Sequence, residues 1–425
     1  MPRTEFQATR DFAAASTAGD PLGKYRARFH FPKLPDGNDC AYLCGHSLGL
    51  QPKSVSACVN QELEDWKRFA VDAHFQARNP WMPYHEMLAG PTARIVGALP
   101  IEVVVMNSLT VNLHLMLVSF YRPTRERNKI LIEANAFPSD QYAVKSQIRY
   151  HGYDPSSSLI EIAPRAGETA TRTEDIEKLI ETKGDEIALV MIAGVNYSTG
   201  EAFDCSRIAA AGRARGCVVG FDMAHAVGNL HLKLHDWNAD FAVWCSYKYL
   251  NAGPGAIGGC FVHERHARNG KLPRFTGWWG HDKATRFQMG PNFQGIAGAE
   301  GWQVSNPSIL SMAALRASME IFDEAGIENL RAKSVILTGY LEFLLEQQSS
   351  DKFSIVTPRD PAHRGAMLSL RMKKVDRAIC DKLAPRGVIC DWREPDILRA
   401  SLAPLYNSFL DAYTFAEKLI SAVEP

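Results

Sequence analysis

Between Glu102 and Val262, short apolar segments alternate with amphipathic ones, and this alternation restricts the possible folds more than any other feature of the sequence. The apolar segments are too short for helices, and most are rich in β-branched residues or bounded by Gly, Asp or Asn, as buried strands are. Strands are predicted at KILIEA (129–134), IALVMIA (187–193), CVVGFD (217–222), FAVWCS (241–246) and GAIGGCFV (255–262). Helices are predicted at 108–121, 173–184 and 204–216. We therefore expect an α/β fold with a large, mostly parallel central sheet flanked by helices.

The pattern changes after Asn306-Pro307, where two amphipathic helices are predicted at 309–326 and 327–348. A shorter mixture of strands and helices follows them. A chain of 425 residues is too long for one small core. We predict a large domain at 66–306 and a smaller α+β domain at 307–425, which the N-terminal segment 1–65 joins.

Composition excludes several classes of protein. The 47 basic residues balance the 47 acidic ones, so a nucleic-acid or acidic-membrane partner is not expected. The sequence has no apolar run of the ~18 residues that span a bilayer, and its start lacks the pattern of a secretion signal. The nine cysteines show no C-x-x-C spacing, so no metal site is predicted and buried free thiols are expected. These features indicate a cytoplasmic enzyme or binding protein.

The segment SYKYLNAGPGAIGG (246–259) permits two interpretations. Its glycines have the G-x-G-x-x-G spacing of a dinucleotide-binding turn, which must join a strand to the start of a helix. Here the glycines lead into a strand-like segment with no helix behind it, so the context of that motif is missing. The alternative centres on Lys248, which follows a predicted strand and therefore lies where open α/β sheets bind ligands.

Asp222 supports the second interpretation. It ends the strand CVVGFD, and a buried carboxylate in that position is costly unless a cation meets it. Pyridoxal phosphate enzymes pair a Schiff-base lysine with an acid that holds the protonated pyridine nitrogen. His225, three residues further on, could orient the carboxylate or the ring. Asp222 and Lys248 together therefore indicate pyridoxal phosphate.

The phosphate and the ring of such a cofactor also need partners. In NSLTVNLHL, Asn107 or Ser108 could cap a helix whose first-turn amides, at Leu109 and Thr110, would bind the phosphate. The AFPSD loop (136–140) follows a predicted strand, so Phe137 could stack on the ring and Asp140 could bond its edge.

Several longer segments resemble the kynureninase family. The most specific are FDMAHAVGNLHLKLHDWNADFAVWCSYKYLNAGPG (221–255) and GWWGHDKATRF (277–287). The segments SLTVNLHLML, AFPSDQYA, VSNPSIL and APLYNSFLDAYTF match in the same order, so the resemblance runs from about Leu43 to Phe415. It implies a homodimeric fold-type-I pyridoxal phosphate enzyme that hydrolyses kynurenine or 3-hydroxykynurenine to alanine and an anthranilate.

The resemblance also assigns roles to residues. Lys248 would bind the cofactor covalently, and Asp222 would hold the pyridine nitrogen. Separately from the resemblance, Tyr247 is a candidate proton carrier because its phenol adjoins the lysine. The remaining cofactor contacts would come from Leu109, Thr110, Phe137, Pro138, Ser139, Asp140, His225, Tyr247, Trp278 and Asn306. Some of these contacts cross the dimer interface in this family.

Five residues match positions that bind substrate in the family. Arg399 would grip the amino-acid carboxylate with its planar fork, with Ser47 close by. His74, Ser305 and Asn306 match positions around the aromatic ring in members that prefer 3-hydroxykynurenine, and we expect that preference here.

The chain departs from the family at two positions. His46 stands where the family commonly has Asn in G-N-S-L-G, and Ala193 stands where a Ser is common. Two alternatives remain at this point: another pyridoxal phosphate reaction, such as desulfuration or transamination, and a non-catalytic binding protein. A desulfurase needs a reactive loop cysteine, whereas Cys245 and Cys260 lie in predicted strands.

Overall fold

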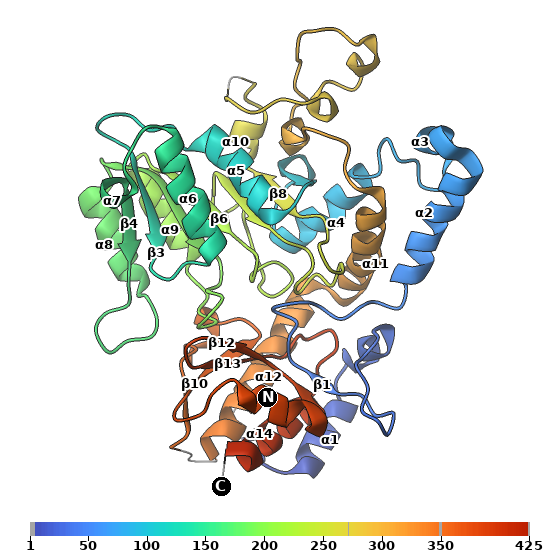
Figure 1. The fold of residues 1–425 in the computed structure, drawn as a ribbon, viewed down its shortest axis with the longest axis vertical. Coiled ribbons are helices and arrows are strands. Elements are labelled where there is room, and N and C mark those ends of the chain that lie inside the picture. The colour runs from blue at the N-terminus through green and yellow to red at the C-terminus, as the bar shows by residue number, and fades with distance from the viewer. Residues whose placement is uncertain (1–4, 271, 348–350, 424–425) are drawn as a thin grey trace.

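The computed structural model describes residues 5–270, 272–347 and 351–423 (Figure 1). Figure 1 shows a larger body built around one sheet, above a smaller body that carries the first and the last of the described residues. In the described part of the chain, no helix is long and apolar enough to cross a membrane.

The central sheet has seven strands in the order β2-β8-β7-β6-β5-β3-β4. Strand β8 runs antiparallel to both of its neighbours, and the other neighbouring strands pair in parallel, so the mostly parallel sheet is confirmed. The five predicted strands correspond to β3 (Lys129–Glu133), β5 (Ile187–Ala193), β6 (Val218–Asp222), β7 (Phe241–Trp244) and β8 (Gly259–Val262). The sequence analysis did not identify β2 (Val103–Val105) and β4 (Leu159–Ile162), which form the two edges.

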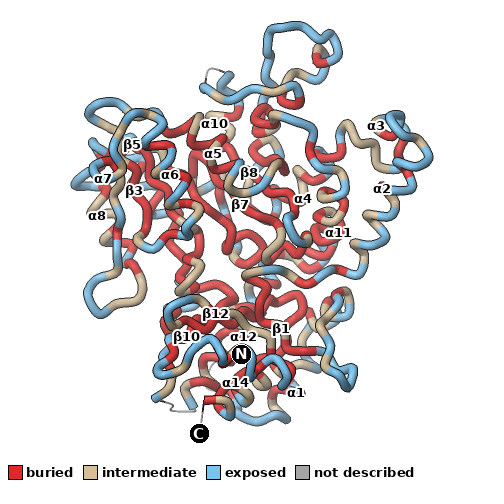
Figure 2. The backbone as a smooth tube through the Cα atoms, viewed as in Figure 1, coloured by how far each residue is buried: buried red, intermediate tan, exposed pale blue. Residues whose placement is uncertain are grey.

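Each face of the sheet has its own hydrophobic core, because successive strand residues point to opposite faces. In β3, Leu131 packs into one core, while Ile130 and Ile132 pack into the other. The second core lies under α5 (Leu109–Phe120) and α6 (Pro138–Tyr150). The first lies under α4 (Glu86–Val96), α8 (Thr173–Lys183), α9 (Cys205–Ala214) and α11 (Ile309–Ala325). Figure 2 shows the resulting buried interior on both sides of the strands.

The smaller body contains a four-stranded antiparallel sheet in the order β12-β13-β10-β9. Its strands are β9 (Phe353–Ile355), β10 (Met367–Met372), β12 (Asp391–Arg393) and β13 (Ile397–Ser401). A separate core joins this sheet to α1 (Arg10–Ala18), α13 (Ala378–Leu383) and α14 (Phe409–Val423). The short β1 (Ala41–Tyr42) pairs in parallel with β11 (Val388–Ile389), which ties the N-terminal segment to this body.

Helix α12 (Ile327–Gln347) contributes to both bodies. Ile327 and Leu330 belong to the large core, whereas the residues from Leu337 to Leu345 belong to the small one. Helix α11 packs on α2 (Val55–Phe69) and α4, within the large core. The division of the chain at residues 65 and 306 stays a prediction.

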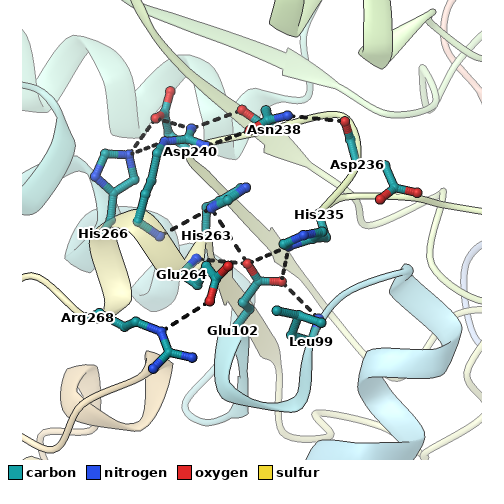
Figure 3. Close-up of polar contacts among 11 residues, drawn as sticks. Leu99, Glu102, His235, Asp236, Asn238, Asp240, His263, Glu264, His266 and Arg268 are labelled. Atoms are coloured by element: carbon teal, nitrogen blue, oxygen red, sulfur yellow. Dashed lines mark hydrogen bonds and ion pairs between the residues drawn. The ribbon is translucent and has the colours of Figure 1, made fainter.

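A polar cluster fixes the β2–β8 edge of the large sheet (Figure 3). The buried Glu102, directly before β2, accepts hydrogen bonds from the backbone of Leu99 (2.9 Å) and of Glu264 (2.8 Å). His235 Nδ1 lies 2.9 Å from the same carboxylate, and this hydrogen bond raises the pKa of His235. Glu102 therefore anchors three separate segments, which explains why a charged group is tolerated in this buried place.

Candidate active site

A cavity with about 540 Å³ of empty space, part of it open to solvent, lies where β3, β5, β6 and β7 end. The carboxyl ends of parallel strands are the usual ligand-binding edge of such a sheet. Nine of the predicted site residues line this cavity: Leu109, Thr110, Phe137, Ser139, Asp140, Asp222, His225, Tyr247 and Lys248. Residues separated by up to 139 positions in the sequence thus meet at one site.

Lys248 and His225 are in direct contact. The Lys248 Nζ lies 3.0 Å from Nε2 of His225, a buried side chain. Burial, followed by the charge of Lys248, holds the pKa of His225 well below its ordinary value. A neutral imidazole therefore accepts a hydrogen bond from the lysine amine. The other ring nitrogen, Nδ1, is buried without a hydrogen-bond partner among the described residues.

Three buried carboxyl groups face the same cavity. Asp222 accepts a hydrogen bond from the Ala224 backbone at 2.7 Å, and burial raises its pKa although Lys248 opposes the rise. Burial, followed by the charge of Asp222, raises the pKa of Asp140, whose Oδ1 has no hydrogen-bond partner in the part of the chain described. Burial raises the pKa of Glu133 to about 7. A cationic group in the cavity would relieve this concentration of acids.

The sequence analysis missed Glu133, although the signal was available. Glu133 ends β3 as Asp222 ends β6, so both acids lie at the ligand-binding edge of the sheet. Its Oε2 accepts a 3.3 Å hydrogen bond from the backbone of Ala193, at the end of the neighbouring strand β5.

Two helices begin at the cavity. Ser108 is the N-cap of α5, but its side chain makes no capping hydrogen bond, so the first-turn amides at Leu109 and Thr110 remain available for an anion. Gly258 packs closely against this turn. A Cβ at that position would lie 3.2 Å from the Leu109 amide nitrogen and 2.9 Å from the Trp244 oxygen, so a larger residue would crowd the helix start. The free helix start therefore suits a phosphate.

The second helix begins where the sequence analysis expected a loop. Pro138 is the first residue of α6, so Pro138, Ser139 and Asp140 form a helical turn rather than the predicted AFPSD loop. Proline is common at the first position of a helix, because the backbone N–H of a residue there has no partner within the helix and proline has no N–H. Phe137 directly precedes the helix and is 42% exposed, with its ring edge-on to Tyr197 at 5.2 Å.

Arg399 lies beside the cavity, in β13, and is 1% exposed. Its guanidinium donates two hydrogen bonds to Asp391, at 2.9 and 2.7 Å, and a third to the Tyr197 backbone oxygen at 2.6 Å. Tyr197 itself lines the cavity. This pairing was not predicted; it depends on β12 and β13 aligning Asp391 opposite Arg399.

His46 occupies a fully buried position between two parts of the site. Its Nε2 lies 3.7 Å from Asp391 Oδ2, and its ring centroid lies 6.4 Å from that of His225. Burial, followed by the charge of Arg399, lowers the pKa of His46 to about 4. At neutral pH, His46 is therefore an uncharged neighbour of the Asp391–Arg399 pair. Ser47 follows it in the same loop and is partly exposed.

Seven predicted residues do not line this cavity: Pro138, Arg399 and Ser47, which are described above, and four others. His74 Nδ1 lies 2.9 Å from the Val71 backbone oxygen, on the α3 (Ala73–Gln76) turn. Trp278 is 39% exposed and donates its indole N–H to the Arg286 backbone oxygen at 3.2 Å. Ser305 and Asn306 are exposed. None of these four residues is among those that line the cavity in the described chain.

Comparison with solved structures identifies the fold. A mutant of C-DES with glycine covalently linked to its PLP cofactor superposes with a TM-score of 0.78 at 17% identity, covering 93% of this chain and 98% of that one. The cysteine desulfurase CsdA from Escherichia coli gives a TM-score of 0.76 at 17% identity, covering 95% and 97%. At this identity the likeness concerns the fold, which is that of the fold-type-I pyridoxal phosphate enzymes.

Sequence comparison is more specific. The family described as Kynureninase C-terminal domain matches residues 330–419. A kynureninase of Koribacter versatilis is 62% identical over 421 residues, covering 99% of this chain and 99% of that protein. One of Myxococcus xanthus is 59% identical over 414 residues, covering 97% of each. Identity at this level over nearly the whole length of both chains shows that this chain belongs to the kynureninase family.

Proposed function

We propose that this chain hydrolyses the bond between Cβ and Cγ of L-kynurenine, L-3-hydroxykynurenine or both. The products are L-alanine and anthranilate or 3-hydroxyanthranilate, in tryptophan catabolism. The observation that carries the proposal is the meeting of Lys248 and Asp222 at one cavity, in a chain that is 62% identical to a kynureninase.

The cofactor of this chemistry is pyridoxal 5′-phosphate, and the described residues fit it. Asp140 Oδ1 and His225 Nδ1, which have no hydrogen-bond partner among the residues described, offer polar contacts inside the cavity. The concentration of buried acids favours the cationic ring nitrogen, and the uncapped start of α5 suits the phosphate. When bound, the cofactor supplies an electron sink for negative charge that develops on the substrate carbon atoms.

Each cofactor contact has a proposed residue. Lys248 would bind the aldehyde carbon, and Asp222 would hold the ring nitrogen, with His225 beside it. Phe137 would stack on the ring, since it lines the cavity and is partly exposed. The turns at Leu109–Thr110 and Pro138–Asp140 would contact the phosphate and the ring edge.

Lys248 is the proposed base for the substrate α-proton. His225 holds the Lys248 Nζ in place at 3.0 Å. Because the pKa of His225 is low, its imidazole stays neutral and does not add a positive charge beside the lysine. Asp222 would keep the ring nitrogen charged. Tyr247 is the proposed proton carrier for the later step on the β-carbon, because its phenol belongs to the residue next to Lys248 and lines the same cavity. An added water would attack the γ-carbonyl before the carbon–carbon bond breaks.

The substrate carboxylate is assigned to Arg399, with Ser47 nearby. Asp391 and the Tyr197 oxygen orient the guanidinium, so they act as positioning groups. His74, Ser305 and Asn306 are assigned to contacts with the aromatic ring of the substrate. Polar groups there favour the 3-hydroxylated substrate, because a buried polar group left without a partner costs about 1–3 kcal/mol.

A homodimer would complete the site. Between α10 (Glu264–Ala267) and η7 (Ala299–Trp302), the described residues 268–270 and 272–298 extend away from the larger body and are largely exposed (Figures 1 and 2). They include the exposed apolar side chains Phe275, Trp278, Phe287, Met289 and Phe293. Exposed apolar groups at this density mark interaction surfaces. We assign Trp278, Asn306, Ser305 and His74 to contacts made across this interface.

A cytoplasmic location is part of the proposal, because nine unpaired cysteines suit a reducing compartment.

The alternatives are less well supported. Cys245 and Cys260 are buried, and burial raises the pKa of both thiols, whereas a desulfurase needs an accessible thiolate. A binding protein without activity would not require both Lys248 and Asp222.

The test is a steady-state assay of the cofactor-loaded protein with kynurenine and with 3-hydroxykynurenine, without any keto acid. Release of the corresponding anthranilate together with alanine is expected, with the higher kcat/KM for 3-hydroxykynurenine. Borohydride reduction should leave the cofactor attached at Lys248. Absence of an anthranilate product from both substrates would contradict the proposal.

A further inference from the structure

Two cysteines outside the cavity lie close enough to react with each other. Cys390 Sγ is 4.0 Å from Cys380 Sγ, which accepts its S–H. Cys380 belongs to α13, and Cys390 lies between β11 and β12. Six of the nine cysteines are buried, whereas Cys380, Cys390 and Cys58 are partly exposed. A small oxidant could therefore reach this pair.

The two thiols differ in acidity in the way that a reactive pair requires. The hydrogen bond from Cys390 lowers the pKa of Cys380, and the same contact raises that of Cys390. A thiolate is therefore favoured on Cys380, the residue that would attack an oxidant, and Cys390 keeps the proton. A disulfide needs an S–S distance of about 2.0 Å, so the two sulfur atoms must approach by about 2 Å.

The pair is joined to the Arg399 anchor through the chain. Cys390 directly precedes Asp391, which holds Arg399 at 2.9 and 2.7 Å. On the other side, the Ile389 backbone oxygen receives hydrogen bonds from Leu43 N at 2.8 Å and from Cys44 Sγ at 3.7 Å. Cys44 begins the loop that carries His46 and Ser47. A shift of Cys390 therefore acts on Asp391 directly.

We propose that Cys380 and Cys390 form a reversible disulfide when the enzyme meets hydrogen peroxide, and that this modification weakens substrate binding at Arg399. The Cys380 thiolate attacks one peroxide oxygen, which gives a sulfenic acid and releases hydroxide. The Cys390 sulfur then attacks the sulfenic sulfur, and water leaves with the thiol proton. Two thiols are oxidised and one peroxide is reduced to two waters. The effect on binding rests on the proposed function, whereas the disulfide itself does not.

The chain allows a direct test with the cofactor-loaded enzyme. Trypsin cleaves after Lys382 and Arg386, so Cys380 and Cys390 fall in separate peptides, 378–382 and 387–393. After mild peroxide treatment, non-reducing mass spectrometry should find these peptides joined, and dithiothreitol should separate them. KM for the kynurenine substrate should rise roughly tenfold, about the loss of one charge-assisted hydrogen bond, with kcat changed by less than about twofold.

Two variants control the experiment. Cys380→Ser should abolish both the joined peptides and the peroxide effect on KM. Cys58→Ser, which removes the third partly exposed cysteine, should leave both unchanged. Failure to find the joined peptides overturns the proposal, and an unchanged KM in the oxidised enzyme overturns its functional half. An enzyme inactive before oxidation would contradict the proposed function instead, while the peptide result would still decide the disulfide.

Discussion

Glu133 gives the cavity a pH dependence that can be measured. Burial raises its pKa from 4.5 to about 7 in the folded chain. The folded state therefore favours the protonated carboxyl. Its contribution to the free energy of unfolding is complete below pH 4.5 and is lost as the pH rises through 7. At about 1.4 kcal/mol per pH unit, the total loss is about 3 kcal/mol, most of it between pH 5 and pH 8.

The variant Glu133→Gln removes this loss, because the amide keeps the size of the acid but carries no charge. Its carbonyl can still accept the Ala193 N–H. The unfolding entropy is about 2.1 cal/mol/K per residue, and the chain has 425 residues. Dividing the loss of about 3 kcal/mol in unfolding free energy by the total entropy gives a change of about 3 °C in Tm. The difference in Tm between variant and wild type, measured on the cofactor-free protein, should grow by that amount from pH 5 to pH 8.

Glu181→Gln is the matched control, since Glu181 is an exposed residue of α8. It should show the same Tm difference from wild type at both pH values. If Glu133→Gln also parallels wild type at pH 5 and pH 8, then Glu133 ionises normally, and the argument from burial fails.

Three further predictions concern other parts of the chain. Asp222→Asn should retain the bound cofactor, seen by its absorbance, but lower kcat by about a hundredfold or more, a loss of roughly 2.7 kcal/mol in transition-state stabilisation; near-normal turnover would disprove the electron-sink role. Tyr247→Phe should lower kcat without loss of cofactor, and unchanged turnover would remove this phenol from the chemistry. Asp20→Asn should lower the free energy of unfolding by about 3–5 kcal/mol in a denaturant titration, because the buried Lys333 loses its ion-pair partner at 2.7 Å. A loss below about 1 kcal/mol would show that the hydrogen bond from Lys333 to the Pro404 oxygen, at 2.6 Å, is enough to stabilise the buried lysine.

Local patterns were enough to select two residues that the fold brings together at the cavity. Asp222 and Lys248 were selected because Asp222 ends one clearly apolar strand and Lys248 follows another, and both line the cavity. Glu133 had the same signal, and Pro138 marked the start of a helix by its known preference for the first turn.

Other features depend on contacts that a local pattern does not contain. The sequence of β8 does not show that it runs antiparallel to its neighbours, because direction is set by the path of the chain between strands. The Asp391–Arg399 pairing depends on the register of β12 against β13. Where His74, Trp278, Ser305 and Asn306 act cannot be read from one chain, because their proposed partners belong to a second copy.

Helix α12 also limits how the two bodies can move. Its 21 residues form a rod about 30 Å long, with one end fixed in each hydrophobic core. Lys248 travels with the first core, whereas Arg399 lies in the sheet packed on the second. Tilting this rod by about 5° at one end would displace the other by roughly 2–3 Å, comparable to the length of a hydrogen bond. A tilt of this helix would therefore change the distance between Lys248 and Arg399, the residues proposed to hold the two ends of a bound amino acid.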